Sequence, residues 1–382
     1  MNSLQMLARH GQSFWMDEMS RGLIISGRLA RLVREDGLRG MTSNPTIFAR
    51  AISSGDDYEE QLRELVGSGA SAEDAALELM LTDIRLAADV LREVHDKAGG
   101  QDGFISIEVP AEVATDTPAT IDWGRKLKRE VARPNVMVKV PATAAGIPAI
   151  EQLLYEGINV NITLMFSVRH YDEVASAFLS GLGRRNQEGL GVDSIASVAS
   201  FFVSRVDTLV DEMIDERQSQ ASGNESHRLA SLRGGAAVAN AKVAYSRFLE
   251  LFASEVFVRL RTAGARPQRP LWASLGTKDP AYSDVKYVEA LIGHDTVSTM
   301  PEGTADAFRD HGRVADTLTE DIEGARSVVA DLEGIGIDLV EVGDRLQEQG
   351  VRSFTEAHQT MAQTVKSRHT QLAAQLAARK PR

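Results

Sequence analysis

Cysteine is absent from the 382-residue sequence, and its absence excludes disulfide bonds, thiolate nucleophiles and cysteine-ligated metal centres. Long hydrophobic runs are absent as well. No stretch approaches the roughly 20 apolar residues that span a membrane, and the first residues lack the basic and apolar regions of a secretion signal. We therefore expect a protein of a reducing compartment, the cytoplasm, with no membrane partner.

The charge balance is acidic, since 54 Asp and Glu outnumber 42 Lys and Arg to give a net charge of −12. The basic residues are scattered among acidic ones, which argues against nucleic acid as a partner and requires a local cation for any anionic ligand. The chain shows no internal repeat and no linker. Its 43% apolar and 25% charged residues are typical of an ordinary globular protein, so we expect it to fold as one domain.

Short apolar runs alternate with helix-length segments along the chain. Parallel strands joined by helices form one sheet, and eight of them close into a barrel, so the pattern predicts an α/β fold of the (β/α)8 TIM-barrel class. An open doubly wound sheet is the alternative, although no Gly-x-Gly-x-x-Gly follows an early strand. The predicted strands are residues 13–17, 38–44, 104–109, 135–140, 158–164, 195–203, 270–275 and 295–299.

Residues 302–382 have the pattern of helices, and the last of these, about residues 351–378, is amphipathic. We expect this part to pack on the barrel within a single domain that covers residues 1–382. A packing or oligomer contact is the favoured role for the last helix, rather than a part in a binding site. The sequence leaves the choice between monomer and homodimer open.

Polar residues on one face of several strands predict the inside of the barrel, because alternate side chains of a barrel strand point inward and outward. In residues 136–140 the valines form one face, which leaves Lys139 pointing inward. Active sites of such barrels lie at the carboxyl ends of the strands. The other polar residues that should converge there are Asp17, Asn44, Glu108, Asn161 and Thr163.

Most of these residues also have a structural explanation. Asp17 and Asn44 are of types that often cap helices or form turns, and Thr163 and Ser200 are common in strands or turns. Lys139 is different, because lysine is almost never buried unless it is paired or functional. With a carboxylate and amide groups predicted around it, we favour a functional lysine.

A buried lysine indicates Schiff-base chemistry. Burial disfavours the ammonium form, and the free amine can attack a ketone to form an imine that serves as the electron sink for carbon–carbon cleavage. The reaction also needs acid and base groups, for which Glu108 and Asp17 are the candidates. The amides of Asn44 and Asn161 and the hydroxyl of Thr163 suit a polyhydroxylated substrate or an ordered water.

Five consecutive motifs resemble those of the transaldolase family, in the same order and spacing within residues 10–310: MTSNPTIF, SIEVPAEVATDT, VMVKVPAT, GINVNITLMFS and SVASFFVSRVD. The segment PLWASLGTKDPAYSDVKYVEALIG is similar to the longer bacterial branch of that family. The resemblance implies a cofactor-independent enzyme of the non-oxidative pentose phosphate pathway. Such an enzyme transfers a dihydroxyacetone unit from sedoheptulose 7-phosphate to glyceraldehyde 3-phosphate and gives erythrose 4-phosphate and fructose 6-phosphate.

The resemblance also implies a role for each matching residue. Lys139 would be the Schiff-base lysine, and Glu108 would be the acid and base that acts through a water held with Thr163. Asp17 would handle the proton of the hydroxyl at the cleaved bond. Asn44, together with Asn161, would bind the hydroxyls of the dihydroxyacetone unit.

For the substrate phosphate, the resemblance implies a site of Ser200, Arg205 and Ser274, in which Arg205 is the required cation. Many family members have a second arginine two residues after the serine that matches Ser274. This chain has Gly276 there. Lys278 is the candidate to replace the missing charge from a shifted position.

Two other functions compete with transfer. The nearest is a Schiff-base aldolase that acts on a related sugar phosphate, for example by cleaving fructose 6-phosphate. Related aldolases tend to lack the glutamate and to have a tyrosine at the position of Phe202, so Glu108 and Phe202 favour transfer. The other is a barrel that binds sugar phosphates without catalysis, which the fold alone does not exclude.

Metal independence is the prediction that follows from the sequence. The eight histidines lack a ligand spacing such as His-x-x-x-His, and an imine would itself be the electron sink. We expect no metal and no cofactor, so activity should survive incubation with excess EDTA. A loss of activity that a divalent ion restores would contradict this expectation.

Overall fold

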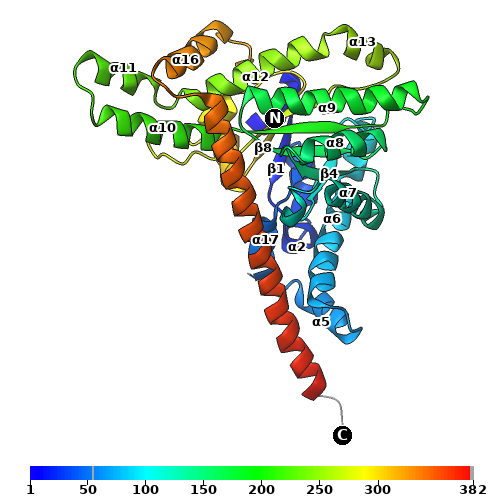
Figure 1. The fold of residues 1–382 in the computed structure, drawn as a ribbon. Coiled ribbons are helices and arrows are strands. Elements are labelled where there is room, and N and C mark those ends of the chain that lie inside the picture. The colour runs from blue at the N-terminus through cyan, green and yellow to red at the C-terminus, as the bar shows by residue number, and fades with distance from the viewer. Residues whose placement is uncertain (54–55, 379–382) are drawn as a thin grey trace.

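The computed structural model describes residues 1–53 and 56–378, and eight parallel strands in it close into a barrel (Figure 1). The strands follow chain order around the barrel, and the last pairs with the first. The predicted TIM barrel is therefore confirmed and the open sheet is excluded. The strands are β1 (Gln12–Asp17), β2 (Gly40–Thr42), β3 (Phe104–Glu108), β4 (Val136–Pro141), β5 (Val160–Met165), β6 (Ser197–Phe202), β7 (Arg269–Ala273) and β8 (Thr296–Met300).

Helices connect the strands and cover the outside of the barrel. Several begin at signals that the sequence carries: Ser71, Asp116 and Ser167 each accept a hydrogen bond from a backbone N–H of the helix that follows. No helix in the described part of the chain is both long and apolar enough to cross a membrane. The α-helices are α1 (Ser3–Leu7), α2 (Arg21–Ile25), α3 (Arg28–Glu35), α4 (Pro45–Ser53), α5 (Glu59–Gly67), α6 (Ala72–Lys97), α7 (Thr117–Val131), α8 (Gly146–Tyr155), α9 (Val168–Gln187), α10 (Ser204–Gln218), α11 (Asn224–Leu232), α12 (Ala236–Phe252), α13 (Glu255–Thr262), α14 (Lys286–Ala290), α15 (Glu302–His311), α16 (Ile322–Gly334) and α17 (Leu339–Ala378).

The strands are buried on both faces, as closed parallel sheets require. In β4 the three valines, Val136, Val138 and Val140, are fully buried within the hydrophobic core. Lys139 lies between two of them, and its side chain points to the other face, into the barrel. The alternation that the sequence predicted for this strand thus places a lysine inside the barrel, near the carboxyl end.

The last helix, α17, is longer than the sequence pattern predicted, because it begins at Leu339 rather than near residue 351. Gly343 and Gly350 hide the first turns of this helix from a reading of the sequence, since glycine is a poor helix former. Both glycines are needed for close packing: a Cβ on Gly343 would lie 2.9 Å from the Cβ of Ser167, and one on Gly350 would lie 2.7 Å from a methyl carbon of Leu164.

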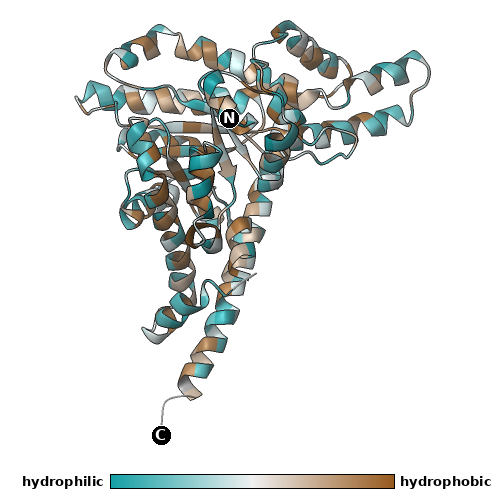
Figure 2. Ribbon diagram, turned by 180° about the vertical axis from the view of Figure 1, so that it is seen from behind, coloured by the Kyte–Doolittle hydropathy of each residue, from teal (hydrophilic) through white to brown (hydrophobic). Residues whose placement is uncertain are grey.

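Along its length α17 packs on α4, α5, α6 and α10. Figure 1 shows it running past the barrel and ending beyond it. Figure 2 shows hydrophobic residues interspersed with hydrophilic ones along the whole helix, as expected for a helix that buries one side. The helix therefore contacts both the barrel strand β5 and the outer helices α4, α5 and α6.

Candidate active site

A cavity of about 190 Å³ lies at the carboxyl ends of the strands, where TIM barrels hold their active sites. A larger cavity, of about 550 Å³, lies at the opposite end, lined largely by apolar residues of α12 and α13 and by arginines, and the lysine–carboxylate pair is not part of it. We therefore place the candidate active site in the smaller cavity. The predicted residues that line it are Asp17, Asn44, Lys139, Thr163, Ser200, Phe202, Arg205, Ser274 and Lys278.

Lys139 is paired with Glu108 beside this cavity. The parallel register of β3 and β4 sets the two residues side by side, and the Nζ of Lys139 lies 3.5 Å from Oε2 of Glu108. Both side chains are only 5% exposed. Nζ also donates a hydrogen bond of 3.2 Å to the backbone carbonyl of Ser43. The structure thus brings together the lysine and the glutamate that the sequence predicted as nucleophile and acid–base group.

The pKa of Glu108 is raised to about 7, chiefly by burial and to a smaller extent by the negative charge of Asp17, while the positive charge of Lys139 opposes the rise. Neither carboxylate oxygen of Glu108 has a hydrogen-bond partner among the described residues, and the same is true of the buried hydroxyl of Thr163. Buried polar atoms are usually satisfied by protein or by ordered water. These atoms therefore have the capacity to bind a water beside Lys139.

Asp17 is held by a hydroxyl rather than acting as a helix cap. The Oγ1 of Thr42 donates to Oδ1 of Asp17 at 2.8 Å, and it also lies 3.0 Å from Oγ1 of Thr299. The helix that follows β1 is capped by Ser20 instead. The structural explanation of Asp17 as a cap is therefore wrong, and one of its oxygens is oriented by a neighbouring strand.

Asn44 does have the structural role that its residue type suggested. Its Oδ1 accepts a 3.0 Å hydrogen bond from the backbone N–H of Ile47, in the first turn of α4. The side chain nevertheless lines the cavity. Because the carbonyl oxygen caps the helix, the amide NH2 is the part of Asn44 that is left to donate a hydrogen bond to a substrate.

Asn161 lies deeper than the sequence alone indicated. It is fully buried, donates through Nδ2 to Oγ of Ser106 at 2.9 Å, and accepts at Oδ1 from Oγ of Ser200 at 2.7 Å. It is not among the residues that line the cavity, whereas Ser200 is. In this arrangement Asn161 forms the layer beneath the cavity and orients Ser200.

The cavity lining also carries two positively charged residues besides Lys139, which are Arg205 and Lys278. Arg205 lies in the first turn of α10, where the helix dipole also favours an anion. Burial lowers the pKa of Arg205, although the charge of Asp17 opposes this. Its guanidinium lies 5.7 Å from the centre of the Phe202 ring and forms no ion pair or hydrogen bond with another residue that the structure describes. Lys278 stands exposed at the rim.

Ser274 follows β7 with a φ of +56°, in the left-handed region that residues other than glycine adopt rarely. Its Oγ lies 3.0 Å from that of Ser204, and its carbonyl accepts a 3.0 Å hydrogen bond from the N–H of Ser204. Such a conformation costs about 1–3 kcal/mol and is retained where the surroundings impose it. Here it holds Ser274 against the start of α10, on the same side as Arg205.

Five further residues line the cavity that the sequence reasoning did not single out: Thr42, Ala273, Thr299, Pro301 and Phe354. Thr42 ends β2 and Thr299 lies one residue before the end of β8, and both point inward, so the alternation rule applied to those strands would have found them. Phe354 comes from α17, and no local pattern connects that helix to the barrel interior. Within the described residues, no group of three or more histidine or acidic side chains is arranged to hold a metal ion.

Comparison with known proteins agrees with this geometry. The family model described as Transaldolase/Fructose-6-phosphate aldolase matches residues 14–365. The chain belongs to this family. Curated relatives named transaldolase cover nearly all of it. Transaldolase 1 of Streptomyces coelicolor is 47% identical over 364 residues, which are 95% of this chain and 94% of that protein.

Two other actinobacterial relatives match to a similar extent. The transaldolase of Saccharopolyspora erythraea is 46% identical over 366 residues, covering 96% of this chain and 97% of its own length. That of Thermobifida fusca is 45% identical over 363 residues, covering 95% and 97%. The resemblance to the transaldolase family that the strand motifs indicated is thereby confirmed.

The raised pKa of Glu108 predicts an acid limb in the pH profile. Below about pH 7 the carboxyl group is protonated and no longer accepts the ammonium proton of Lys139, so kcat/KM should fall as the pH decreases through that value. We expect Glu108→Gln to lose this limb along with most activity. Measuring kcat/KM for the donor from about pH 5 to about pH 9 in both proteins tests this. An unchanged limb in the variant would assign the ionisation to another group.

We predict that replacing the two cations of the phosphate site, Arg205 and Lys278, lowers activity to different extents. Arg205 is partly buried and can bind a phosphate through two hydrogen bonds, so Arg205→Ala should lower kcat/KM for phosphorylated substrates by about 30-fold or more. Lys278 is exposed, and Lys278→Ala should cost no more than about fivefold. Unphosphorylated substrates are the control. Equal losses with both kinds of substrate would remove these residues from the phosphate site.

Proposed function

We propose that this chain catalyses the transaldolase reaction through an imine on Lys139. A dihydroxyacetone unit passes from sedoheptulose 7-phosphate to glyceraldehyde 3-phosphate and gives erythrose 4-phosphate and fructose 6-phosphate. The observation that carries the proposal is the buried pair of Lys139 and Glu108, 3.5 Å apart, beside a cavity that Lys139 and Arg205 both line. We further propose that the enzyme acts in the cytoplasm, as a single domain that needs no cofactor.

Imine formation is the first step. The ammonium group of Lys139 gives a proton to Glu108, whose raised pKa makes it a suitable acceptor near neutral pH. The free amine then attacks the donor carbonyl. Glu108 returns the proton, through a water bound with Thr163, to the hydroxyl of the carbinolamine, which leaves as water. The iminium that remains is positively charged and draws electrons from the neighbouring bond.

Cleavage of the carbon–carbon bond is the task of Asp17. Its carboxylate takes the proton of the hydroxyl that is β to the iminium carbon, the bond breaks, and its electron pair neutralises the iminium to form an enamine. The hydrogen bond from Thr42 holds Asp17 in place for this transfer. The aldose phosphate product then leaves, while the three-carbon unit stays on Lys139.

Transfer reverses these steps with a second aldose phosphate. The enamine carbon attacks the new aldehyde, Asp17 returns the proton to the oxygen, and hydrolysis of the imine releases the ketose phosphate. The phosphate of either aldose is bound by Ser200, Arg205, Ser274 and Lys278, because erythrose 4-phosphate and glyceraldehyde 3-phosphate differ only by one carbon of the chain. Asn44 contacts the hydroxyls, and Asn161 lies beneath Ser200 and orients it.

A coupled assay for glyceraldehyde 3-phosphate, with fructose 6-phosphate as the donor, tests the proposed function. Turnover that depends on added erythrose 4-phosphate supports a transferase. Equal turnover without an acceptor would instead indicate the aldolase, and no turnover under either condition would indicate a binding protein. Glu108 and Phe202 are the residues that favour the first outcome.

The separate roles of the two carboxylates predict that their variants stall at different steps. Glu108→Gln should form a borohydride-trappable adduct slowly, by a factor of roughly 10² to 10⁴. Asp17→Asn should form the imine readily but fail to cleave it, so mass spectrometry should find an adduct that retains all carbons of the donor. If Asp17→Asn yields only the three-carbon adduct at the wild-type rate, cleavage does not depend on Asp17.

A further inference from the structure

One stripe of α17 lies against the carboxyl end of the barrel. It consists of Gly343, Gln347, Gly350 and Phe354, which are spaced by four, three and four residues and therefore share one face of the helix. The two glycines admit no side chain without a clash, so the helix backbone lies in direct contact with the segment that follows β5 and with Leu164. The position of every side chain on this stripe is thus closely constrained.

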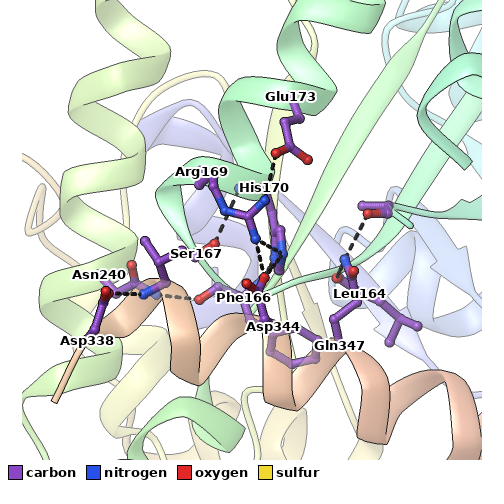
Figure 3. A network of polar contacts seen from close by, with 12 residues as sticks. Leu164, Phe166, Ser167, Arg169, His170, Glu173, Asn240, Asp338, Asp344 and Gln347 are labelled. Atoms are coloured by element: carbon purple, nitrogen blue, oxygen red, sulfur yellow. Dashed lines mark hydrogen bonds and ion pairs between the residues drawn. The ribbon is translucent and has the colours of Figure 1, made fainter. Parts of the chain in front are cut away.

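Gln347 joins this stripe to the two strand ends that carry the chemistry. Its Nε2 donates to the carbonyl of Ala142, just after β4, at 2.8 Å and to the carbonyl of Leu164, in β5, at 3.1 Å (Figure 3). Leu164 has a φ of +62°, a conformation that leucine adopts rarely, and it directly follows Thr163. Gln347 therefore satisfies backbone carbonyls one residue from Thr163 and three from Lys139.

A second set of contacts anchors the first turns of α17. Asp344 pairs with Arg169 and lies 3.0 Å from Nε2 of His170, at the start of α9 (Figure 3). The N–H of Phe166 donates to Nδ1 of His170 at 3.3 Å, so Nε2 carries the proton and donates to Asp344. Burial lowers the pKa of His170, which favours this neutral form. The helix is therefore fixed at more than one point before it reaches the cavity.

Phe354 is the residue of the stripe that reaches the active site. Its side chain is 8% exposed, it lines the catalytic cavity, and its ring centre lies 5.7 Å from Nζ of Lys139. With Glu108 and Leu164 it also lines a space of only about 10 Å³. A space of that size holds at most about one water molecule. The ring thus lies close to Lys139 and leaves little room for water between α17 and the neighbouring Glu108.

We propose that Phe354, positioned by Gln347, shields the imine on Lys139 from water and so favours transfer of the three-carbon unit over its hydrolysis. This inference rests on the proposed function, in which a covalent intermediate waits for an acceptor. In the competing reaction the enamine carbon takes a proton to give an iminium, water adds to the iminium carbon, and the carbon–nitrogen bond breaks. Dihydroxyacetone and the free lysine amine are the products.

The location of Phe354 suits this role for two physical reasons. An apolar ring excludes the water that hydrolysis consumes, which is how closed active sites protect reactive intermediates. An aromatic ring face near a cation also stabilises the positive charge that develops at the lysine nitrogen when the iminium forms. A polar residue at this position would supply neither effect and would attract water.

The test is the ratio of dihydroxyacetone release without acceptor to transfer with erythrose 4-phosphate, measured with fructose 6-phosphate as the donor. Phe354→Ala should raise this ratio by roughly tenfold, the rate change that corresponds to the loss of one ordinary interaction. Phe354→Leu keeps an apolar side chain and should restore most of the wild-type ratio. Leu372→Ala is the matched control, because Leu372 is buried on the same helix but about 27 Å farther along its axis.

Gln347→Glu keeps the size of the side chain but removes the two hydrogen bonds to carbonyls, and it should raise the same ratio even if Phe354→Ala does not fold. A general loss of stability lowers both rates together and leaves the ratio unchanged, which is the result expected for Leu372→Ala. An unchanged ratio in Phe354→Ala and in Gln347→Glu would overturn the shielding proposal. Failure of the proposed function would differ, since the wild type would then show no transfer that depends on added erythrose 4-phosphate.

Discussion

The burial of Lys139 beside Glu108 is the constraint on which the rest of the site depends. Closing eight strands into a barrel removes both side chains from water, to 5% exposure, and the register of β3 and β4 sets them 3.5 Å apart. Taking charges out of water is costly unless they are paired or can share a proton. Burial therefore raises the pKa of Glu108 to about 7, where the carboxyl can exchange a proton with the lysine at neutral pH.

Other unfavourable features gather at the same end of the barrel. Leu164 and Ser274 adopt left-handed backbone conformations, and buried oxygens of Glu108 and Thr163 lack partners among the described residues. Such features persist where a well-packed surrounding imposes them, and they are concentrated at functional sites. Here the surrounding includes the fully buried valines of β4 and the helix α17, which is fixed to the barrel through Gln347. The core thus stabilises an arrangement that the site alone would not keep.

Much of this arrangement follows from the sequence, because a strand has a period of two and its carboxyl end is easily located. That rule placed Lys139 inside the barrel and would equally have found Thr42. The rule does not show how far below the cavity an inward-pointing side chain lies, so it did not predict that Asn161 lies beneath the cavity. The alternation rule also applies only to strands, not to helices. Nothing in the local pattern of α17 indicates that Phe354 contacts a strand that lies more than two hundred residues earlier. Contacts of that kind depend on how the finished barrel and helix pack.

Trapping the intermediate tests the central claim most directly, because the claim concerns one atom, the Nζ of Lys139. Borohydride added with fructose 6-phosphate should reduce the imine and leave a three-carbon adduct, which peptide mapping should locate on Lys139. The variant Lys139→Met should keep its fold, give no adduct and show no turnover. An adduct mapped to a different residue, or full turnover in Lys139→Met, would contradict the account.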